Sequence, residues 1–434
     1  MKILITHAYT KENKGDAAIL SVLLMQARLA FPQAQIKVST FEDSNKNKNF
    51  DGYETISSYM YLAVYTYKKF LQKLLYACYI VASTLLWATI LRYFNFDSKF
   101  LLIQPIREIA EEFQQADLII PIGGGYLRAK PNIMESVNLT LLLHPILLSL
   151  LLRKPVVLYS QSIGPFFNLY QRTLTRLILN RTKLILARED HTINTLKQIG
   201  VKQDRIIRTV DAGFLFEPKR VLSLSQVIPS EKLQNKLLVG ITVRKWLAKE
   251  KQKTYEKSIA RFIDNATKNN NLLFIFIPQV SSAFHKDDDR VVAGRIMQYI
   301  KNKNQAINLE TDYTHRQIKS LYSDLDYVIG TRFHSIIFSL TSYVPALAIE
   351  YEYKTGGIMK DLGLGEWVIP IEQVTTKFLM EKFQELIEKR ESYLQTLHAT
   401  IAPYQKQAGE NVVYIKKAYN NYYIQNTGYS VYYI

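Results

Sequence analysis

The chain alternates short apolar segments, typical of buried strands, with longer segments whose apolar residues recur at helical spacing. Near the amino end, residues 2–6 form a predicted strand, 17–30 a predicted helix and 35–41 a second predicted strand. This strand–helix–strand order predicts a parallel sheet covered by helices. The same alternation begins again with the apolar run 237–243 and continues toward the carboxyl end.

Two blocks of this pattern are separated by residues 217–236, which have no sustained period and contain two prolines. A chain of 434 residues is also too long for one ordinary domain. We therefore expect an N-terminal α/β domain over 1–216, a linker over 217–236 and a C-terminal α/β domain with closing helices over 237–434. The expected fold class is α/β, with two doubly wound Rossmann-like domains facing a cleft.

Residues 59–94 interrupt the first block with a long aromatic and aliphatic run. Within it, 74–91 contains no charged residue, and Lys68, Lys69, Lys73 and Arg92 flank it. Three interpretations fit this composition: a buried helical hairpin, an interfacial helix with aromatic and basic anchors, and a membrane span. A second apolar helix is expected over 139–152, with His144 and Pro145 interrupting it and Arg153 and Lys154 directly after it.

The formal net charge of +17 adds polyanions and anionic membrane surfaces to the possible partners. A nucleic-acid partner is not expected, because the chain lacks zinc-ligand spacing, an RNA-binding aromatic signature and a recognisable DNA-reading helix pair. The one cysteine, Cys78, has no partner for an internal disulfide, which fits a reducing cytoplasm. The first six residues are too short an apolar core for a secretory signal, so a cytoplasmic location is expected.

Charged residues collect after two successive predicted strands of the second block. Arg332 and His334 follow the strand 327–329 and the Gly330 break, and Glu350 and Lys354 follow the strand that begins at Pro345. Strand ends at the carboxyl edge of a parallel sheet are where α/β proteins bind ligands. This pattern favours a ligand crevice over a surface arginine beside a core histidine.

Three further positions at element ends are candidates for binding. Arg244 stands at the tip of the strand 237–243, and Asp16 stands where the first helix begins, as a ligand or as a helix cap. The glycines 123–125, including Gly124 and Gly125, follow the strand 117–122 and allow close approach of a ligand or tight packing. These glycines match neither the P-loop motif nor the glycine fingerprint of dinucleotide-binding domains.

These blocks resemble the signature of the polysaccharide pyruvyl transferase family. The most specific part is Gly330-x-Arg332-x-His334-Ser335, followed by Pro345, Lys354-x-x-Gly357 and Asp361-Leu362-Gly363-Leu364. Weaker blocks appear in family order: Asn13-x-Gly15-Asp16, the three glycines 123–125, Gln161 to Pro165, Ala187 to Glu189 and Gly240 to Arg244. The resemblance covers most of the chain and also implies a glycosyltransferase-B-like arrangement.

The resemblance implies transfer of the pyruvyl group of phosphoenolpyruvate onto two hydroxyls of one sugar, giving a cyclic ketal and phosphate. Such a site needs a proton donor, a base and cations for phosphate and carboxylate, and it needs no metal or other cofactor in principle. The candidate roles are acid/base for His334 and anion binding for Arg332, Arg244 and Lys354. Glu350 would orient His334 or bind a sugar hydroxyl, and Asp16 would bind a hydroxyl from the other domain; Gly124 and Gly125 are further binding candidates.

Two other functions remain open from the residues. A nucleotide-sugar glycosyltransferase of the two-domain B type would use Arg332 for a diphosphate and Glu350 for a ribose. A membrane-surface scaffold without turnover would account for the charge and the apolar run but not for the Arg332–His334 motif. For the transferase, we expect a sugar acceptor of a bacterial surface polysaccharide or its lipid-linked precursor, and peripheral attachment to an anionic inner membrane face.

Overall fold

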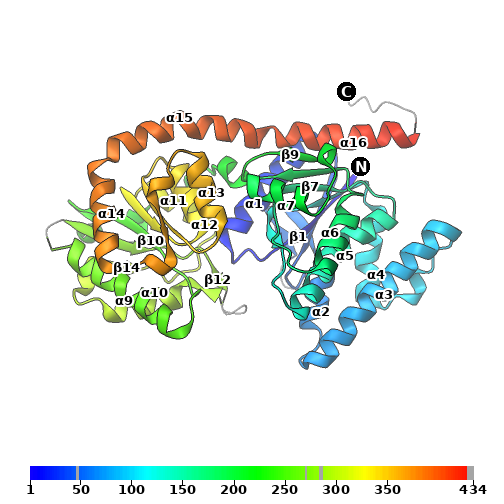
Figure 1. Ribbon diagram of the computed structural model, residues 1–434, viewed down its shortest axis with the longest axis horizontal. Coiled ribbons are helices and arrows are strands. Elements are labelled where there is room, and N and C mark those ends of the chain that lie inside the picture. Colours follow the sequence, from blue (N-terminus) through cyan, green and yellow to red (C-terminus); the bar gives the residue numbers. More distant parts are fainter. Residues whose placement is uncertain (45–47, 269–270, 283–286, 428–434) are drawn as a thin grey trace. The chain divides into compact units, whose positions relative to one another are not determined.

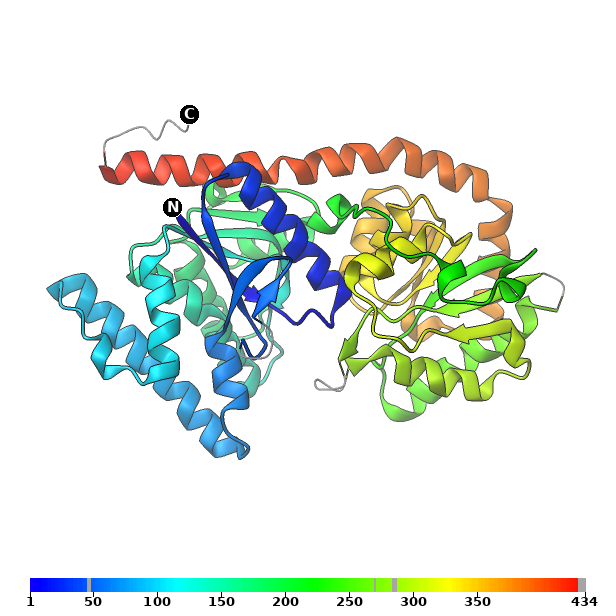
Figure 2. The ribbon, with the colours of Figure 1, turned by 180° about the vertical axis from the view of Figure 1, so that it is seen from behind.

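The computed structural model describes residues 1–434 except 45–47, 269–270, 283–286 and 428–434, and it divides into two compact units (Figures 1 and 2). Unit 1 comprises Met1–Thr10, Ile19–Ala212 and Gln407–Ile434, and unit 2 comprises Lys11–Ala18 and Gly213–Lys406. This division differs from the expected domains 1–216 and 237–434. The expected linker belongs to unit 2, residues 11–18 join unit 2, and the last helix joins unit 1.

Unit 1 is built on parallel strands in the order β3-β4-β2-β1-β5 and β6-β7-β8-β9. A parallel bridge between Ile119 and Val156 joins the two sets, and the Ile119 amide donates to the Pro155 carbonyl at 3.0 Å. The antiparallel β3–β4 pair is the exception to the parallel pattern. The strands are β1 (Lys2–Ala8), β2 (Gln35–Thr40), β3 (Asn49–Phe50), β4 (Tyr53–Ser57), β5 (Leu118–Pro121), β6 (Gly124–Leu127), β7 (Val157–Ile163), β8 (Leu184–Ala187) and β9 (Ile206–Arg208).

The helices of unit 1 cover both faces of its sheet (Figures 1 and 2). Helices α3 to α6 pack against one another, whereas α16 packs on β7 and β8 beside α1, where Phe31 and Tyr419 meet edge to face at 5.4 Å. The helices are α1 (Lys14–Ala30), α2 (Tyr59–Tyr65), α3 (Phe70–Phe94), α4 (Gln104–Gln115), α5 (Ile133–Leu151), α6 (Leu169–Leu179), α7 (Asp190–Gln198) and α16 (Asn411–Thr427). Helix α1 begins among the residues of unit 2.

Unit 2 has one six-stranded parallel sheet in the order β14-β11-β10-β15-β16-β17, with a short β12–β13 hairpin beside it. Its strands are β10 (Leu237–Thr242), β11 (Leu272–Phe276), β12 (Ser281–Ser282), β13 (Asp287–Asp288), β14 (Ala306–Asn308), β15 (Tyr327–Gly330), β16 (Ala346–Glu350) and β17 (Val368–Pro370). Its helices are α8 (Ser230–Leu233), α9 (Lys249–Ala266), α10 (Asp289–Tyr299), α11 (His315–Tyr322), α12 (Phe333–Leu340), α13 (Tyr353–Asp361), α14 (Thr376–Glu388) and α15 (Arg390–Gly409). These two parallel sheets confirm the predicted pair of Rossmann-like α/β domains.

Two local expectations are corrected. Helix α5 starts six residues before the expected 139 and runs through Pro145, because tertiary packing of its buried residues outweighs the loss of one hydrogen bond. The glycines 123–125 were expected only to follow a strand, but Gly124 begins the strand β6. The expected closing helices are present as α14 and α15, separated at Lys389.

Candidate functional site

The candidate site lies at the carboxyl edge of the unit 2 sheet, where the order of its strands reverses. Strand β10 is first in the sequence, and its neighbours β11 and β15 lie on opposite sides of it. In open α/β sheets, ligands bind outside the carboxyl ends of the strands at such a reversal. Arg244 follows β10, and Arg332 and His334 follow β15, so the structure brings three of the predicted residues to this point of unit 2.

Hydroxyl groups between these two strand ends shape the turn that carries Arg332. The Thr242 Oγ1 accepts the backbone N–H of Thr331 at 3.0 Å and that of Arg332 at 3.2 Å, and it meets the Ser335 Oγ at 2.8 Å. The Thr331 Oγ1 meets the Tyr255 hydroxyl at 2.8 Å. These buried bonds satisfy backbone groups where β15 ends, so that helix α12 begins directly after Arg332.

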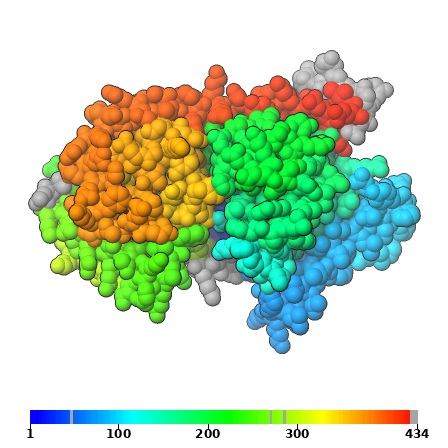
Figure 3. Space-filling view, viewed as in Figure 1, coloured from blue at the N-terminus to red at the C-terminus, as the bar shows by residue number. Residues whose placement is uncertain are grey.

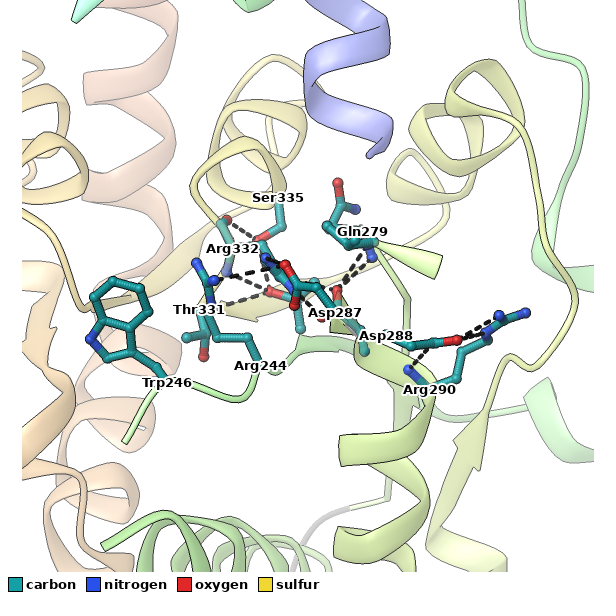
Figure 4. Close-up of polar contacts among 12 residues, drawn as sticks. Arg244, Trp246, Gln279, Asp287, Asp288, Arg290, Thr331, Arg332 and Ser335 are labelled. Atoms are coloured by element: carbon teal, nitrogen blue, oxygen red, sulfur yellow. Dashed lines mark hydrogen bonds and ion pairs between the residues drawn. The ribbon is translucent and has the colours of Figure 1, made fainter. Parts of the chain in front are cut away.

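The guanidinium of Arg332 is enclosed by two carboxylates (Figure 4). Its Nε and Nη2 donate to the Asp289 Oδ1 at 3.0 and 2.6 Å, and its Nη2 and Nη1 donate to the Asp287 Oδ1 and Oδ2 at 2.5 and 3.2 Å. Burial would lower the pKa of Arg332, but the charge of Asp289 and the hydrogen bonds to Asp287 raise it well above its ordinary value. From the sequence, Arg332 was predicted to bind a substrate anion directly. In the structure its guanidinium is instead already paired with Asp287 and Asp289.

Asp289 connects Arg332 to the loop before the β12–β13 hairpin. Its Oδ2 accepts the backbone N–H groups of Gln279 and Val280, each at 3.0 Å. The side chain is 3% exposed, so its charge depends on these donors and on Arg332. Asp287 is 37% exposed and therefore also faces solvent. Of the two carboxylates, Asp287 is the one that an entering ligand could displace.

Arg244 is held by aromatic rings instead of carboxylates. Its guanidinium carbon lies 4.3 Å from the centre of the Tyr351 ring and 4.8 Å from that of Trp246. The Nη2 is 3.9 Å from the Asp287 Oδ2, beyond hydrogen-bond distance (Figure 4). Its Nε is buried and has no hydrogen-bond partner among the residues that the structure describes. Arg244 therefore retains a donor that an anion could take.

The ring of His334 lies against the first turn of α1. A Cβ atom at Gly15 would stand 2.0 Å from the His334 Nδ1, so only glycine fits there while the ring keeps its place. Asp16 is the next residue, and its Oδ2 accepts from the Asn13 Nδ2 at 2.7 Å. Asp16 was expected to reach the site from the other domain; this is corrected, because residues 11–18 belong to the same unit as His334.

Residues 12–14 are attached to unit 2 like an added strand. The Lys14 N–H donates to the Gln279 carbonyl at 2.9 Å, and the Ser281 N–H donates to the Glu12 carbonyl at 3.1 Å. The buried Lys14 Nζ pairs with the Asp312 Oδ1 at 2.7 Å, which lowers the pKa of that carboxyl against the opposing effect of burial. These contacts fix the backbone of Gly15 where His334 packs.

Glu350 is the last residue of β16, and Lys354 lies in the first turn of α13. The Glu350 Oε1 accepts the Gly356 N–H at 2.8 Å, which places a negative charge at the positive end of this helix. The Lys354 Nζ is 3.2 Å from the Glu352 Oε2 and lies 5.4 Å from the centre of the Phe333 ring. Both residues stand at or just after the end of β16, next to β15, the strand that precedes Arg332. Their binding roles stay predictions.

Gly124 and Gly125 lie in unit 1, apart from the residues that unit 2 brings together. In unit 1 the strand order reverses between β1 and β5, and His7 of β1 stacks on Tyr126 of β6 with ring centres 4.8 Å apart. The His7 Nε2 meets the Leu142 carbonyl at 2.7 Å. Burial lowers the pKa of His7 to about 4 although this bond opposes the shift, so the ring is neutral near pH 7.

Sequence reasoning missed the residues that hold Arg332, Arg244 and His334 in place. These residues are Asp287, Asp289, Thr242, Trp246, Tyr351 and Gly15. Only the position of Tyr351 and Trp246 just after strand ends was a signal that could have found two of them. Within the described part of the chain, no three His, Cys, Asp or Glu residues are placed to hold a metal ion.

Comparison with known proteins matches this chain to a family and to a curated relative. The model of the polysaccharide pyruvyl transferase family matches residues 13–353. The amylovoran biosynthesis protein AmsJ of Erwinia amylovora is 24% identical over 304 residues, which cover 67% of this chain and 70% of AmsJ.

Two solved structures share the fold at low identity. The UDP-GlcNAc 2-epimerase from Neisseria meningitidis, bound to UDP-GlcNAc, has a TM-score of 0.56 at 14% identity, covering 96% of this chain and 99% of its own. The S. aureus MnaA–UDP structure has a TM-score of 0.59 at 11% identity, covering 100% and 99%. The glycosyltransferase-B-like fold class is thus confirmed, and at this identity the likeness extends to the fold alone.

Proposed function

Because the chain belongs to the polysaccharide pyruvyl transferase family, and is therefore a transferase, we propose that it moves the pyruvyl group of phosphoenolpyruvate onto two hydroxyls of one sugar. The products are a cyclic ketal and inorganic phosphate. The acceptor is a sugar of a bacterial surface polysaccharide or of its lipid-linked precursor.

The observation that carries the proposal is the buried Nε of Arg244 at the strand reversal of unit 2, which has no hydrogen-bond partner among the described residues. Two rings fix this guanidinium in place, so little side-chain entropy is lost when it binds an anion. The planar fork of arginine suits carboxylate and phosphate, which phosphoenolpyruvate carries together. Arg332 contributes a second positive charge at the end of the neighbouring strand, and it gains a ligand-facing edge when the half-exposed Asp287 moves away.

His334 supplies the proton transfers in this proposal. A protonated His334 gives its proton to the methylene carbon of phosphoenolpyruvate, and a sugar hydroxyl attacks the adjacent carbon, forming a C–O bond. The C–O bond to phosphate then breaks, and the second hydroxyl closes the ketal on that same carbon. Of the two hydroxyl protons, one replaces the proton that His334 gave and the other leaves with phosphate. A positioned acid of this kind contributes about 10²–10⁴-fold.

Unit 1 is the proposed acceptor side. Aromatic rings follow its strand ends: Tyr9, after β1, stacks on Phe41, after β2, with centres 5.8 Å apart, and Tyr65 of α2 meets Phe41 at 5.5 Å. Neutral sugar rings suit such a surface better than they suit the ion pairs of unit 2.

Calorimetry of phosphoenolpyruvate binding tests the donor assignment. Wild-type protein should bind phosphoenolpyruvate, Arg244→Lys should bind it more weakly, and Arg261→Lys, on the exposed side of α9, should bind it normally. Phosphate release from phosphoenolpyruvate in the presence of soluble and lipid-linked glycans then identifies the acceptor. Protection from thermal unfolding by a nucleotide sugar but not by phosphoenolpyruvate would replace the proposal with a glycosyltransferase.

A further inference from the structure

Helix α3 has one face in the protein core and one face exposed, and both are apolar. Its inner face contributes Tyr76, Ile80, Trp87 and Ala88 to the core of unit 1. The opposite face exposes large apolar residues at helical spacing, beginning with Leu71 and Leu75, which are 64% and 61% exposed. The remaining members of this face are Cys78, Tyr79, Leu86 and Tyr93. Soluble proteins rarely leave so long an apolar stripe uncovered.

The inner face also bears polar contacts that tie α3 to its neighbours. The Thr84 Oγ1 meets the His144 Nε2 of α5 at 2.8 Å, and the Trp87 Nε1 donates to the Asp97 Oδ1 at 3.0 Å. By length and composition α3 and α5 are each able to cross a membrane, and 33% of the apolar window of α3 is buried. The inner face of α3 is packed on the protein, so only its outer face is available to a partner. This arrangement fits an interfacial helix and not a membrane-spanning helix, which would face lipid on all sides that other spans do not cover.

Helices α3 and α5 run side by side in the same direction, since Thr84 contacts His144 and the Arg92 Nη1 donates to the Leu150 carbonyl at 3.0 Å. Their first turns therefore lie at the same end of the pair. There α5 exposes Ile133, at 84%, and α6 exposes Leu169, at 81%. Figure 3 shows α2 and α3 protruding from unit 1, with the start of α5 beside their lower end. The apolar face thus continues from α3 onto neighbouring helices.

The charge along α3 has one sign, whereas the first turn of α5 contains Glu135. From residue 58 to residue 96 the sequence contains no Asp or Glu, and its four charged residues are Lys68, Lys69, Lys73 and Arg92. Lys68 and Lys69 are exposed directly before α3. Arg128 and Lys130 are exposed directly before α5. An anionic partner fits this border, whereas a second copy of the same face would bring like charges together.

We propose that the outer face of α3, with the first turns of α5 and α6, docks on an anionic lipid bilayer. The leucine and aromatic side chains enter the acyl boundary, and the lysines before α3 contact the lipid phosphates. Apolar insertion and basic attraction are each weak alone, and together they give stable peripheral attachment. This attachment concerns the surface of unit 1 and does not depend on the reaction at unit 2.

Cosedimentation with vesicles tests the docking without any substrate. The protein should bind vesicles that contain phosphatidylglycerol at about 0.1 M salt, bind pure phosphatidylcholine poorly and be released at about 1 M salt, where the Debye length falls from about 10 Å to about 3 Å. Leu71→Glu with Leu75→Glu should weaken partitioning at least tenfold. Lys68→Gln with Lys69→Gln should weaken binding to the anionic vesicles roughly tenfold.

Helix α1 offers a matched control for the leucine pair. Met25 and Leu29 have the same spacing and are 45% and 64% exposed on the same unit, so Met25→Glu with Leu29→Glu should leave partitioning unchanged. Equal losses in both double variants would overturn the proposal. So would wild-type protein that stays in the supernatant, or binding that resists salt and alkaline washing as a span does.

The single cysteine supplies a second readout. Cys78 is exposed on the outer face of α3, so a polarity-sensitive fluorophore attached there should shift its emission to shorter wavelength when phosphatidylglycerol vesicles are added. A label that senses no change while the protein sediments with vesicles would place the contact on another surface. Concentration-dependent dimerisation that Leu71→Glu abolishes, without lipid binding, would assign the face to a second copy instead.

Discussion

In both units the strand order reverses beside the first strand, β1 or β10, yet the two units place different chemistry at that point. In unit 2 this point holds Arg244, Arg332 and the carboxylate of Asp287. In unit 1 it holds the stacked rings of His7 and Tyr126, with the Tyr126 hydroxyl accepting from the Gln161 Nε2 at 2.8 Å. The fold places strand ends at such a point in both units, and the residues just after the strands decide which ligand can bind there.

The comparison also shows two ways of burying polar groups at these two points. In unit 2, Asp289 is buried with Arg332 as its counter-charge, whereas in unit 1 the buried His7 is neutral near pH 7. Away from this point, unit 1 also buries an ion pair, between Arg188 and Asp211. His144, bonded to Thr84, has its pKa lowered to about 3 by burial and by the neighbouring His7. A strand-reversal point with neutral rings favours neutral ligands, and one with arginines favours anions, which matches the proposed division between acceptor and donor.

The largest expected effect comes from breaking the ion pairs of unit 2. Arg332→Met leaves Asp289 buried without its cation and should lower the free energy of unfolding by about 3–5 kcal/mol, measured by urea denaturation. Lys377→Met, which removes an exposed pair on α14, should lower it by less than about 0.5 kcal/mol. Similar small losses in both variants would show that the pairing around Arg332 is not essential to unit 2.

The next effect contrasts the histidines at the two reversal points. His334→Ala should lower turnover about a hundredfold or more while leaving phosphoenolpyruvate binding intact, because the proposed acid is lost. His7→Gln should affect turnover far less, since a ring with a pKa near 4 carries no proton to give near pH 7. Steady-state phosphate release and calorimetry distinguish the two. Near-normal turnover in His334→Ala would reduce this residue to a packing role against Gly15.

A third effect concerns the acid sensitivity of unit 1. The folded pKa of His144, about 3, lies below its ordinary value of 6.5, so its contribution to stability is complete above pH 6.5 and is lost as pH falls toward 3. Between pH 7 and pH 5 the wild type should lose about 2 kcal/mol through this group. His144→Gln should lose correspondingly less over the same interval in urea titrations. Parallel losses in both proteins would place the acid sensitivity elsewhere.

The smallest effect tests the geometry of the anion site. Arg244→Lys keeps the charge but loses the planar fork and its stacking on Tyr351 and Trp246, so phosphoenolpyruvate affinity should fall about tenfold. Calorimetry measures this directly, and thermal unfolding without ligand reports whether the fold is intact. Unchanged affinity would transfer the anion-binding role to Arg332 or Lys354.

Sequence patterns located the strands and the residues at their ends because those signals are local. The run Tyr327 to Ile329, the Gly330 break and the following Arg332 and His334 lie within eight residues and were predicted in place. The partners of Arg332 were not, since Asp289 lies 43 residues away and only the packing of the β12–β13 hairpin brings it close.

The same limit applies to Gly15 and His334. Nothing in the sequence near either residue indicates that they touch, because the contact depends on residues 12–14 joining the edge of unit 2. Likewise, the apolar run 74–91 indicated a helix, but its composition alone left three environments open. The burial of Tyr76, Ile80 and Trp87 on one side, with Leu71 and Leu75 exposed on the other, identified a helix with two apolar faces.

The position of residues 11–18 within unit 2 has a genetic consequence. A recombination event between two related genes, with its crossover anywhere between codons 18 and 213, would take all of unit 2 except residues 11–18 from one parent. It would therefore take Gly15 from one parent and His334 from the other. If the first parent encoded any larger residue at position 15, its Cβ would meet the imidazole at 2.0 Å. Segments 11–18 and 332–335 are therefore expected to be inherited together, although nearly the whole of unit 1 is encoded between them.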